Sequence, residues 1–332
     1  MTCPPPIAAT EPAARIWILA CDAECAVREM ARTEEISDWL ARPGHFIWLD
    51  IADPTAADFA MLREEFGFHP LSLEDAANQQ QRPKVDEYPT YYYVVTYVLD
   101  GPDDALIEVD LFVGENYVVS THPGRPAALA EARRRWERGG ELLREGVGFL
   151  VYTITDAIID TYFPAVDRIE DEIDATQEAI FTRFQPDAVR QLLALKGKLF
   201  EIRRVLYPLR ETFNTFLRRD RPIFRASSFL YFQDVYDHVL RLLDVVDIQR
   251  EMLTGTLDAY LSAVSNRLSE TVQRLTVLAV CLTIGALVFG AFGMNLPGIP
   301  WAQHPQGFAV VVAMTLFLVG VTLSLARWRR WL

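Results

Sequence analysis

The chain has 332 residues, of which 51% are hydrophobic, and a formal net charge of −13 at pH 7. This content allows a core in two or three units of ordinary size, and the negative charge argues against nucleic acid as a natural partner and favours cations. The four cysteines have no framework spacing, and the first residues lack the apolar stretch of a signal peptide, so we expect the soluble part to stay in the cytosol.

The N-terminal third predicts a cytosolic mixed α/β domain. Residues 1–14 are rich in proline and alanine, which predicts disorder, and strand and helix signals then alternate over residues 15–122. A helix N-cap is expected at Asp53 or Thr55. Strands are predicted at residues 15–20, 46–51, 91–99, 105–113 and 117–121, and helices at residues 33–40, from residue 53 or 55 to residue 66, and at residues 70–77.

Helix signals dominate residues 123–226. After a basic helix at residues 127–138, a long helix at residues 148–184, interrupted near Pro164, and a return helix at residues 186–219 predict an antiparallel helical hairpin. Its first arm is strongly acidic, which indicates either a solvated face paired with the basic return arm or a surface that attracts cations. The acids are Asp156, Asp160, Asp167, Glu170, Asp171, Glu172, Asp174 and Glu178.

Residues 227–294 predict one helix that starts in the cytosol and ends across a membrane. The segment contains no proline, and at 1.5 Å per residue it would be roughly 100 Å long. Within its last part, residues 275–294, Cys281 is the only ionisable side chain. About 20 such residues are the length that crosses a bilayer, so we expect the first transmembrane helix there.

A second uncharged run at residues 308–326 follows a linker at residues 295–307 and precedes a basic tail at residues 327–332. The linker has no lysine or arginine, whereas arginines flank the other ends of both runs. By the positive-inside rule the protein is multi-pass, with both termini cytoplasmic and the linker outside.

The tripeptide Gly293-Met294-Asn295 ends the first transmembrane run. Two spans per chain are too few to surround a pore, so a conducting form needs several copies. A ring of asparagine side chains can hold a hydrated cation without removing its water, which suits magnesium because this ion loses water reluctantly. The structural alternative for the tripeptide is a helix C-cap.

Several segments in one order resemble the CorA superfamily of divalent-cation channels. They are FGMN (292–295), WLDIADP (48–54), FGFHPLSLEDAANQQQRPKVDEY (66–88), YFQDVYDHVLRLLD (231–244) and LDAYLSAVSNRLSETVQRLTVLA (257–279). The resemblance implies an α+β membrane protein of the bacterial inner membrane. Its cytosolic α/β domain, long helical stalk and two C-terminal transmembrane helices would assemble as a homopentameric funnel.

The resemblance also implies roles for individual residues. Asn295 would form the selectivity ring, and Asp75 and Asp234, with Glu74 nearby, would bind regulatory Mg²⁺ between neighbouring subunits. Surface charge or helix capping is the structural alternative for these acids. Cytosolic Mg²⁺ would then lock the closed state. Pore-lining positions hold Asp258, Ser269, Val272, Leu275, Thr283 and Ala286, and we add Gly290, where glycine permits close helix approach.

Relatives often have a proline where this chain has Ile284 and a bulky apolar residue where it has Thr283, so the position of the gate stays open. The linker lacks the acidic residue that many magnesium-conducting relatives carry, so the transported ion stays open as well. It is instead similar to the linker of the ZntB branch, which makes His304 a candidate zinc or pH element.

Three hypotheses about function follow. None of them makes the protein an enzyme, because the sequence contains no catalytic motif. The first is a magnesium channel, with cobalt or nickel as further ions. The second is a ZntB-like, proton-coupled zinc transporter. The third is a membrane-anchored regulatory module whose two spans only anchor it. His69, His122 and His238 are expected in capping or core roles.

Overall fold

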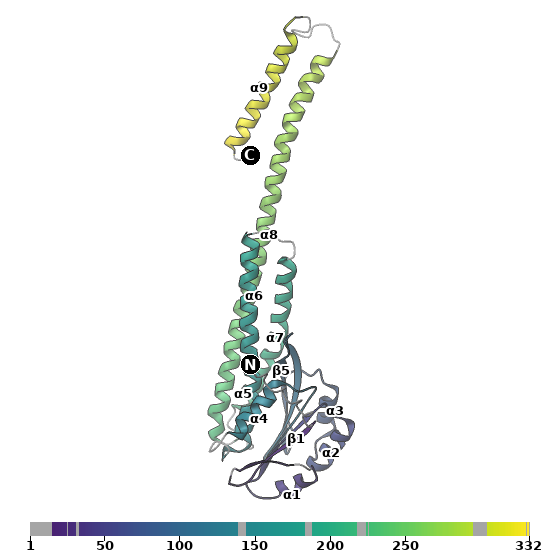
Figure 1. The fold of residues 1–332 in the computed structure, drawn as a ribbon, viewed down its shortest axis with the longest axis vertical. Helices are drawn as coiled ribbons and strands as arrows, with labels where there is room; N and C mark the ends of the chain where they lie inside the picture. Colours follow the sequence, from purple (N-terminus) through teal and green to yellow (C-terminus); the bar gives the residue numbers. More distant parts are fainter. Residues whose placement is uncertain are drawn as a thin grey trace, which may run out of the picture. The chain divides into compact units, whose positions relative to one another are not determined.

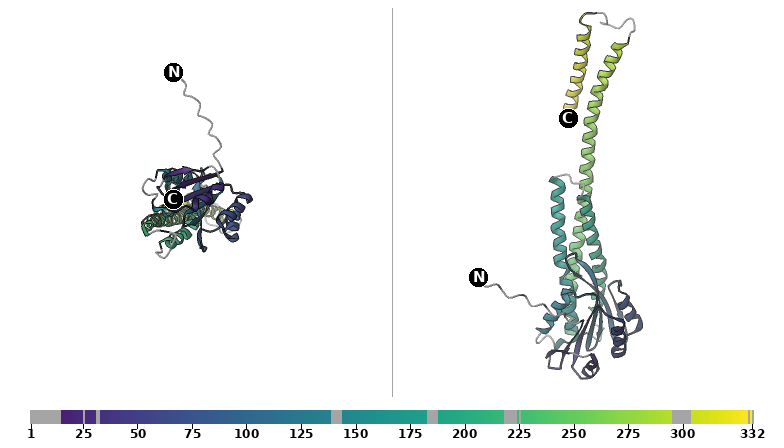
Figure 2. Two further views of the ribbon diagram at one scale, coloured as in Figure 1. Left: turned by 90° about the horizontal axis from the view of Figure 1, so that it is seen from below. Right: turned by 45° about the vertical axis from the view of Figure 1, so that its right-hand side comes forward.

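The computed structural model describes residues 15–24, 26–30, 33–138, 144–182, 188–217, 224, 226–294, 304–329 and 331. It comprises two compact units, Met1–Leu253 and Thr254–Leu332. Figures 1 and 2 show the elements of each unit.

The first unit is built on a seven-stranded sheet with the order β2-β1-β3-β7-β6-β5-β4. Neighbouring strands are antiparallel except β3 and β7, which are parallel with Ile47 opposite Tyr117. The strands are β1 (Ile16–Cys21), β2 (Val27–Glu29), β3 (Phe46–Ala52), β4 (Lys84–Glu87), β5 (Tyr91–Asp100), β6 (Ala105–Gly114) and β7 (Tyr117–His122). The five predicted strands are present, whereas β2 and β4 are short and polar and the sequence did not predict them.

One face of the sheet is covered by α1 (Ile36–Leu40), α2 (Ala56–Phe66) and α3 (Pro70–Asn78), as Figure 1 shows. Alternate strand residues such as Ile47, Tyr93 and Phe112 form the core on this face. Thr55 is the N-cap of α2: its side chain and that of Asp58 form a capping box, which settles the choice between Asp53 and Thr55.

The opposite face of the sheet packs against α4 (Ala127–Glu137) and α5 (Val147–Asp160). Trp136 of α4 lies edge-on to Phe46, with ring centroids 5.4 Å apart. The segment Val147–Ile180 is long and apolar enough to cross a bilayer, but 72% of its most apolar window is buried inside the protein. We therefore interpret α5 as a core helix, because its apolar side chains already have protein partners.

The predicted hairpin is present as α6 (Tyr162–Thr182) packed against α7 (Ala188–Phe216). The interruption predicted near Pro164 is present at Thr161, and Pro164 itself lies in the first turn of α6, where proline is tolerated. Thr161 links α5 to the sheet. Its Oγ1 donates to the carbonyl of Ile158 in α5 (2.7 Å) and accepts the backbone N–H of Leu99 in β5 (3.2 Å).

The second unit contains the C-terminal part of α8 (Phe229–Gly293) and α9 (Gly307–Trp328), which returns alongside it in both ribbon views. Only 11% of the most apolar window in each helix is buried. Threonine hydroxyls in these windows donate to the carbonyl four residues earlier, as Thr283 does to Ala279 (2.7 Å) and Thr315 to Val311 (2.8 Å). Both helices are therefore suited to a bilayer, where polar groups need partners within the segment.

Candidate metal centre

Asp75, the first predicted metal ligand, lies on α3, which begins at an N-cap formed by His69. The Nδ1 atom of His69 accepts the backbone N–H of Leu71 (3.2 Å), so the expected capping role of this histidine is confirmed. Asp75 is half-buried and its Oδ2 lies 2.8 Å from Nζ of Lys84, which also lies 2.6 Å from Asp86. Asp75 therefore has an internal cationic partner on β4.

The loop between Asp75 and Lys84 has an unusual backbone. Gln79 and Gln80 have φ angles of +53° and +69°, in the left-handed region that disfavours side chains. Glu108 holds this loop: its Oε2 accepts the backbone N–H of Gln81 (2.9 Å) and the hydroxyl of Tyr97 (2.6 Å). The buried carboxylate of Glu108 thus fixes the path of the chain between the two charged partners.

Glu108 and Asp110 are neighbours on one face of β6, and both are buried. The Tyr93 hydroxyl donates to Oδ1 of Asp110 (2.7 Å), whereas Oδ2 has no hydrogen-bond partner among the described residues. Burial raises the pKa of Asp110 to about 7, although the bond from Tyr93 opposes the shift. Burial also raises the pKa of Glu108, against hydrogen bonds from Tyr97 and from the loop backbone.

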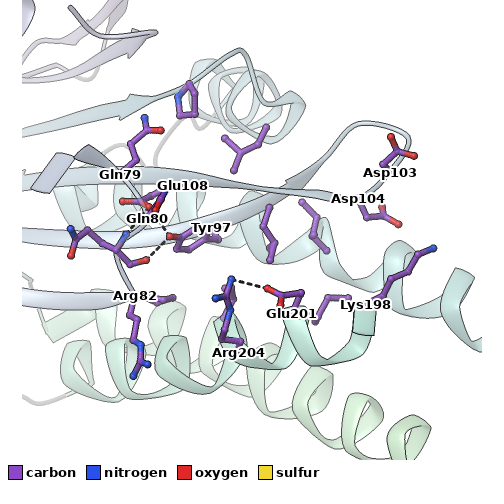
Figure 3. A pocket seen from close by; sticks show the side chains of 18 of the residues that line it. Gln79, Gln80, Arg82, Tyr97, Asp103, Asp104, Glu108, Lys198, Glu201 and Arg204 are labelled. Carbon is purple, nitrogen blue, oxygen red and sulfur yellow. Dashed lines mark hydrogen bonds and ion pairs between the residues drawn. The ribbon is translucent and has the colours of Figure 1, made fainter. Parts of the chain in front are cut away.

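Glu108 lines a cavity of about 820 Å³ between the strands β5 and β6 and the helix α7. Figure 3 shows Glu108 beside Tyr97 and Gln80, and the Arg204–Glu201 ion pair on the α7 side. Both acidic and basic side chains line this cavity, so it has no single charge preference.

A second group of ligand-type side chains lies between α5 and α8. One ligand atom each of Asp156, Asp160 and His238 lies within 4.8 Å of the others. We call these three residues the Asp156 cluster. His238 Nδ1 is 3.7 Å from Oδ1 of Asp156, and its Nε2 is 3.9 Å from Oδ1 of Asp234, the other predicted ligand. Carboxylate oxygens and imidazole nitrogens can ligate divalent cations, with the carboxylates suiting Mg²⁺ best.

Arg135 of α4 also contacts this cluster. Its Nη1 lies 2.8 Å from Oδ2 of Asp156 and its Nη2 lies 2.9 Å from Oδ2 of Asp160. Burial and the nearby charge of Asp160 raise the pKa of Asp156, while Arg135 and His238 lower it.

Sequence reasoning missed the Asp156 cluster. It placed Asp156 and Asp160 within a general acidic face and assigned His238 to a capping or core role. A signal was available, because Asp156 and Asp160 are four residues apart on one helix, as are Asp234 and His238 on another. An ion pair links the two arms of the hairpin at Glu172, which lies 3.7 Å from Lys198.

The predicted channel residues lie in the second unit. Gly293 ends α8 and Met294 follows it, while Asn295 lies outside the described residues. All seven predicted pore positions are exposed: Asp258, Ser269, Val272, Leu275, Thr283, Ala286 and Gly290. Their spacings of about three, four, eight and eleven residues put them on one side of a helix. Val277 and Val288 are buried and fall on the opposite side.

His304 lies just before α9. Its Nδ1 accepts the backbone N–H of Gln306 (3.2 Å) and its carbonyl accepts that of Gly307 (2.9 Å). His304 therefore has a structural role at the start of α9, whether or not it also binds an ion.

Comparison with known proteins gives a consistent result. The profile of a family described as "CorA-like Mg2+ transporter protein" matches residues 43–327. The putative metal ion transporter YfjQ of Bacillus subtilis is 31% identical, over 82% of this chain and 86% of that protein. The cobalt/magnesium transport protein CorA of Thermotoga maritima is also 31% identical, over 86% of this chain and 83% of that protein.

The complete structure of the CorA magnesium transporter from Methanocaldococcus jannaschii superposes with a TM-score of 0.82 at 21% identity, covering 95% of this chain and 98% of that one. This match confirms the predicted fold of a mixed α/β domain, a long helix and C-terminal apolar helices. A more distant relative is the zinc transport protein ZntB of Cronobacter sakazakii, 26% identical over 87% of this chain and 88% of that protein.

Proposed function

Because the chain belongs to the CorA-like Mg²⁺ transporter family, we propose that it is a homopentameric channel that carries Mg²⁺ across the bacterial inner membrane, with Co²⁺ and Ni²⁺ as further ions. The protein is a membrane protein with C-terminal transmembrane helices, and its family is one of transporters, not enzymes. Both termini lie in the cytoplasm in this proposal. The α/β domain (15–122), helical region (123–226), stalk (227–294), linker (295–307) and second span (308–326) keep the roles expected from the sequence.

The observation that carries the proposal is the placement of the expected pore positions on one side of α8, opposite two of its buried valines. The seven expected pore positions share an exposed side, and the buried residues Val277 and Val288 lie on the other. A helix that lines a pore needs one side for packing and one for the ion path. Val272 and Leu275, which are 52% and 59% exposed, are apolar and would form a dewetting constriction when five copies meet.

Asn295, supported by Gly293 and Met294, forms the selectivity ring in this proposal. Five amide side chains would face one hydrated cation at the outer mouth. Contact through the water shell suits Mg²⁺, which prefers to keep several waters.

Gating is proposed to depend on acidic groups of the first unit. Asp75 and Asp234, with Glu74 nearby, bind regulatory Mg²⁺ between subunits, and the Asp156 cluster is a further candidate site beside Asp234. Carboxylates that face each other repel until a divalent ion bridges them. Loss of cytosolic Mg²⁺ would loosen the ring and favour the open state.

The test is ion flux into liposomes that contain the purified full-length protein. Magnesium entry driven by membrane potential, abolished by Asn295→Ala, is the expected result. Asn266→Ala is the matched control, because Asn266 is exposed on α8 away from the pore side. Flux that persists unchanged in Asn295→Ala would remove the selectivity ring from the proposal. A complete lack of flux would favour the third hypothesis, an anchored regulatory module.

Proton-coupled zinc transport is the second candidate function. The match to ZntB and the linker with His304 favour it. Zinc entry that requires a pH gradient and is lost in His304→Ala would establish this alternative. Magnesium entry without a pH gradient would exclude it.

A further inference from the structure

We propose that Arg135 is a built-in counter-cation of the Asp156 cluster, so that a divalent cation binds there in competition with its guanidinium group. The proposal rests on the proposed role of this cluster as a metal site. It adds a regulatory element, because the affinity of the site is then set by a residue that is not a metal ligand.

The geometry of Arg135 fits a bridging cation. Its two terminal nitrogens contact two different carboxylates, Asp156 at 2.8 Å and Asp160 at 2.9 Å. An arginine cannot lose its proton in a protein, so this positive charge is permanent. Asp156 is mostly buried, with 12% of its side chain exposed, so its charge is poorly solvated and needs a partner when no metal is bound.

A metal ion and Arg135 need the same carboxylates. An ion held by the Asp156 cluster takes oxygens of Asp156 and Asp160 and a nitrogen of His238, and Mg²⁺ holds its ligands at about 2.0–2.1 Å. One oxygen of each carboxylate is already bonded to Arg135. An ion beside the remaining oxygens would lie close to a fixed positive charge, and this repulsion lowers its affinity until the guanidinium moves away.

A second partner for the displaced guanidinium is already in place. The Nε atom of Arg135 lies 3.2 Å from Oε1 of Glu131, one turn earlier on α4. The Glu131 side chain is 40% exposed and its Oε2 atom already accepts hydrogen bonds from Arg134, so Arg135 would share this carboxylate when it shifts toward Oε1. Helix α4 stays in place during this shift, because the neighbouring Trp136 is packed against Phe46 and Phe149.

The rival explanation is a purely structural ion pair between α4 and α5. The two explanations predict opposite results for metal binding. A structural pair would make Arg135→Gln less stable without tightening metal binding. A counter-cation predicts that the same variant binds metal more tightly, because one competing positive charge has been removed.

The experiment measures Mg²⁺ binding to the full-length protein in detergent by isothermal titration calorimetry, with MgCl₂ as the titrant. Binding that is lost in Asp156→Asn defines the cluster's own component. For this component we expect Arg135→Gln to bind about tenfold more tightly, the order expected for removing one unit charge a few ångströms away. Arg133→Gln should match the wild type, since Arg133 lies on the same helix but pairs with Glu29 and Glu137.

If Arg135→Gln is less stable than the wild type, thermal unfolding with and without Mg²⁺ provides a second test of the proposal. The rise in melting temperature on adding Mg²⁺ should be larger in this variant than in the wild type, and Arg135→Lys should resemble the wild type. Equal or weaker Mg²⁺ binding in Arg135→Gln would overturn the proposal and leave the channel function intact. Unchanged binding in Asp156→Asn would overturn both the counter-cation and the cluster's part in gating, whereas the flux test of Asn295 decides the channel itself.

Discussion

Asp110 offers a sharp test of how burial controls charge in the first unit. Its side chain is fully buried on β6, with one oxygen bonded to Tyr93 and the other without a partner among the described residues. Replacement of Asp110 by Asn keeps an oxygen that accepts the Tyr93 hydrogen bond but removes the ionisable group. The variant therefore isolates the cost of ionising this carboxyl.

The magnitude follows from the two pKa values. Burial raises the pKa of Asp110 to about 7 in the folded protein, while the unfolded chain has the ordinary value of about 3.9. Below pH 4 both states hold the proton, so Asp110 contributes no pH dependence. Between pH 4 and 7 only the unfolded state releases the proton, so the folded state loses stability by about 1.4 kcal/mol per pH unit, or about 4 kcal/mol in total.

The assay is thermal unfolding of the full-length protein in detergent, followed by tryptophan fluorescence at pH 5 and pH 8. The variant and the wild type should be closer in stability at pH 5, where most Asp110 is protonated in the folded state. At pH 8 Asp110→Asn should melt higher by roughly 2–4 °C per kcal/mol. Asp103→Asn, an exposed acid on the β5–β6 turn, is the control. An Asp110→Asn advantage that does not grow between pH 5 and pH 8 would refute the reasoning.

Three further predictions concern single contacts. Burial alone would raise the pKa of Asp58, but hydrogen bonds from Arg15 and the capping threonine lower it to about 2. The ionised Asp58 therefore stabilises the folded state above pH 4, and this contribution is lost as the pH falls toward 2. Arg15→Gln should therefore lower the free energy of unfolding at pH 7 by about 1–2 kcal/mol, seen as a lower melting temperature, and should have less effect at pH 3. Lys84→Met should tighten Mg²⁺ binding that depends on Asp75 severalfold, measured by calorimetry, because it removes a competing cation. Gly148→Ala should cost about 1–3 kcal/mol in thermal unfolding, because the new Cβ would lie 2.1 Å from a serine hydroxyl.

Matched variants separate these effects from general damage. Lys196→Met changes a lysine of α7 outside the predicted metal sites, and Gly197→Ala adds a Cβ with no atom within 4 Å. Weaker Mg²⁺ binding in Lys84→Met would contradict the competition argument. Equal losses for Arg15→Gln at pH 7 and pH 3 would show that packing, not charge, accounts for the effect of Arg15.

Much of the fold could be predicted from the sequence, because the relevant signals are local. Thr55 was recognisable as an N-cap, and the apolar runs of α8 and α9 have the length that a bilayer needs. Strand β4 was missed because its residues Lys84–Glu87 are mostly charged. It forms by pairing with β5, a contact that no local pattern reveals.

The candidate site was less predictable for the same reason. Asp75 and Asp234 were found through a family resemblance, and their roles remain proposals. The Asp156 cluster depends on two helices that are distant in sequence and meet only in the folded unit. The ion pairs of Lys84 and Arg135 likewise arise from tertiary packing, which charge patterns along the chain do not specify.

The hydrogen bonds by which Glu108 and Tyr97 hold the loop at Gln79 and Gln80 have a consequence for which substitutions the protein can tolerate during evolution. Two successive left-handed residues that are not glycine cost about 1–3 kcal/mol each, so they persist only while Glu108 and Tyr97 hold the loop. A change at Glu108 would release the loop and shift Asp75 relative to Lys84, without touching either residue. In a genetic screen for altered magnesium sensitivity, compensating substitutions are therefore expected in the interior of β5 and β6 as well as at the charged surface.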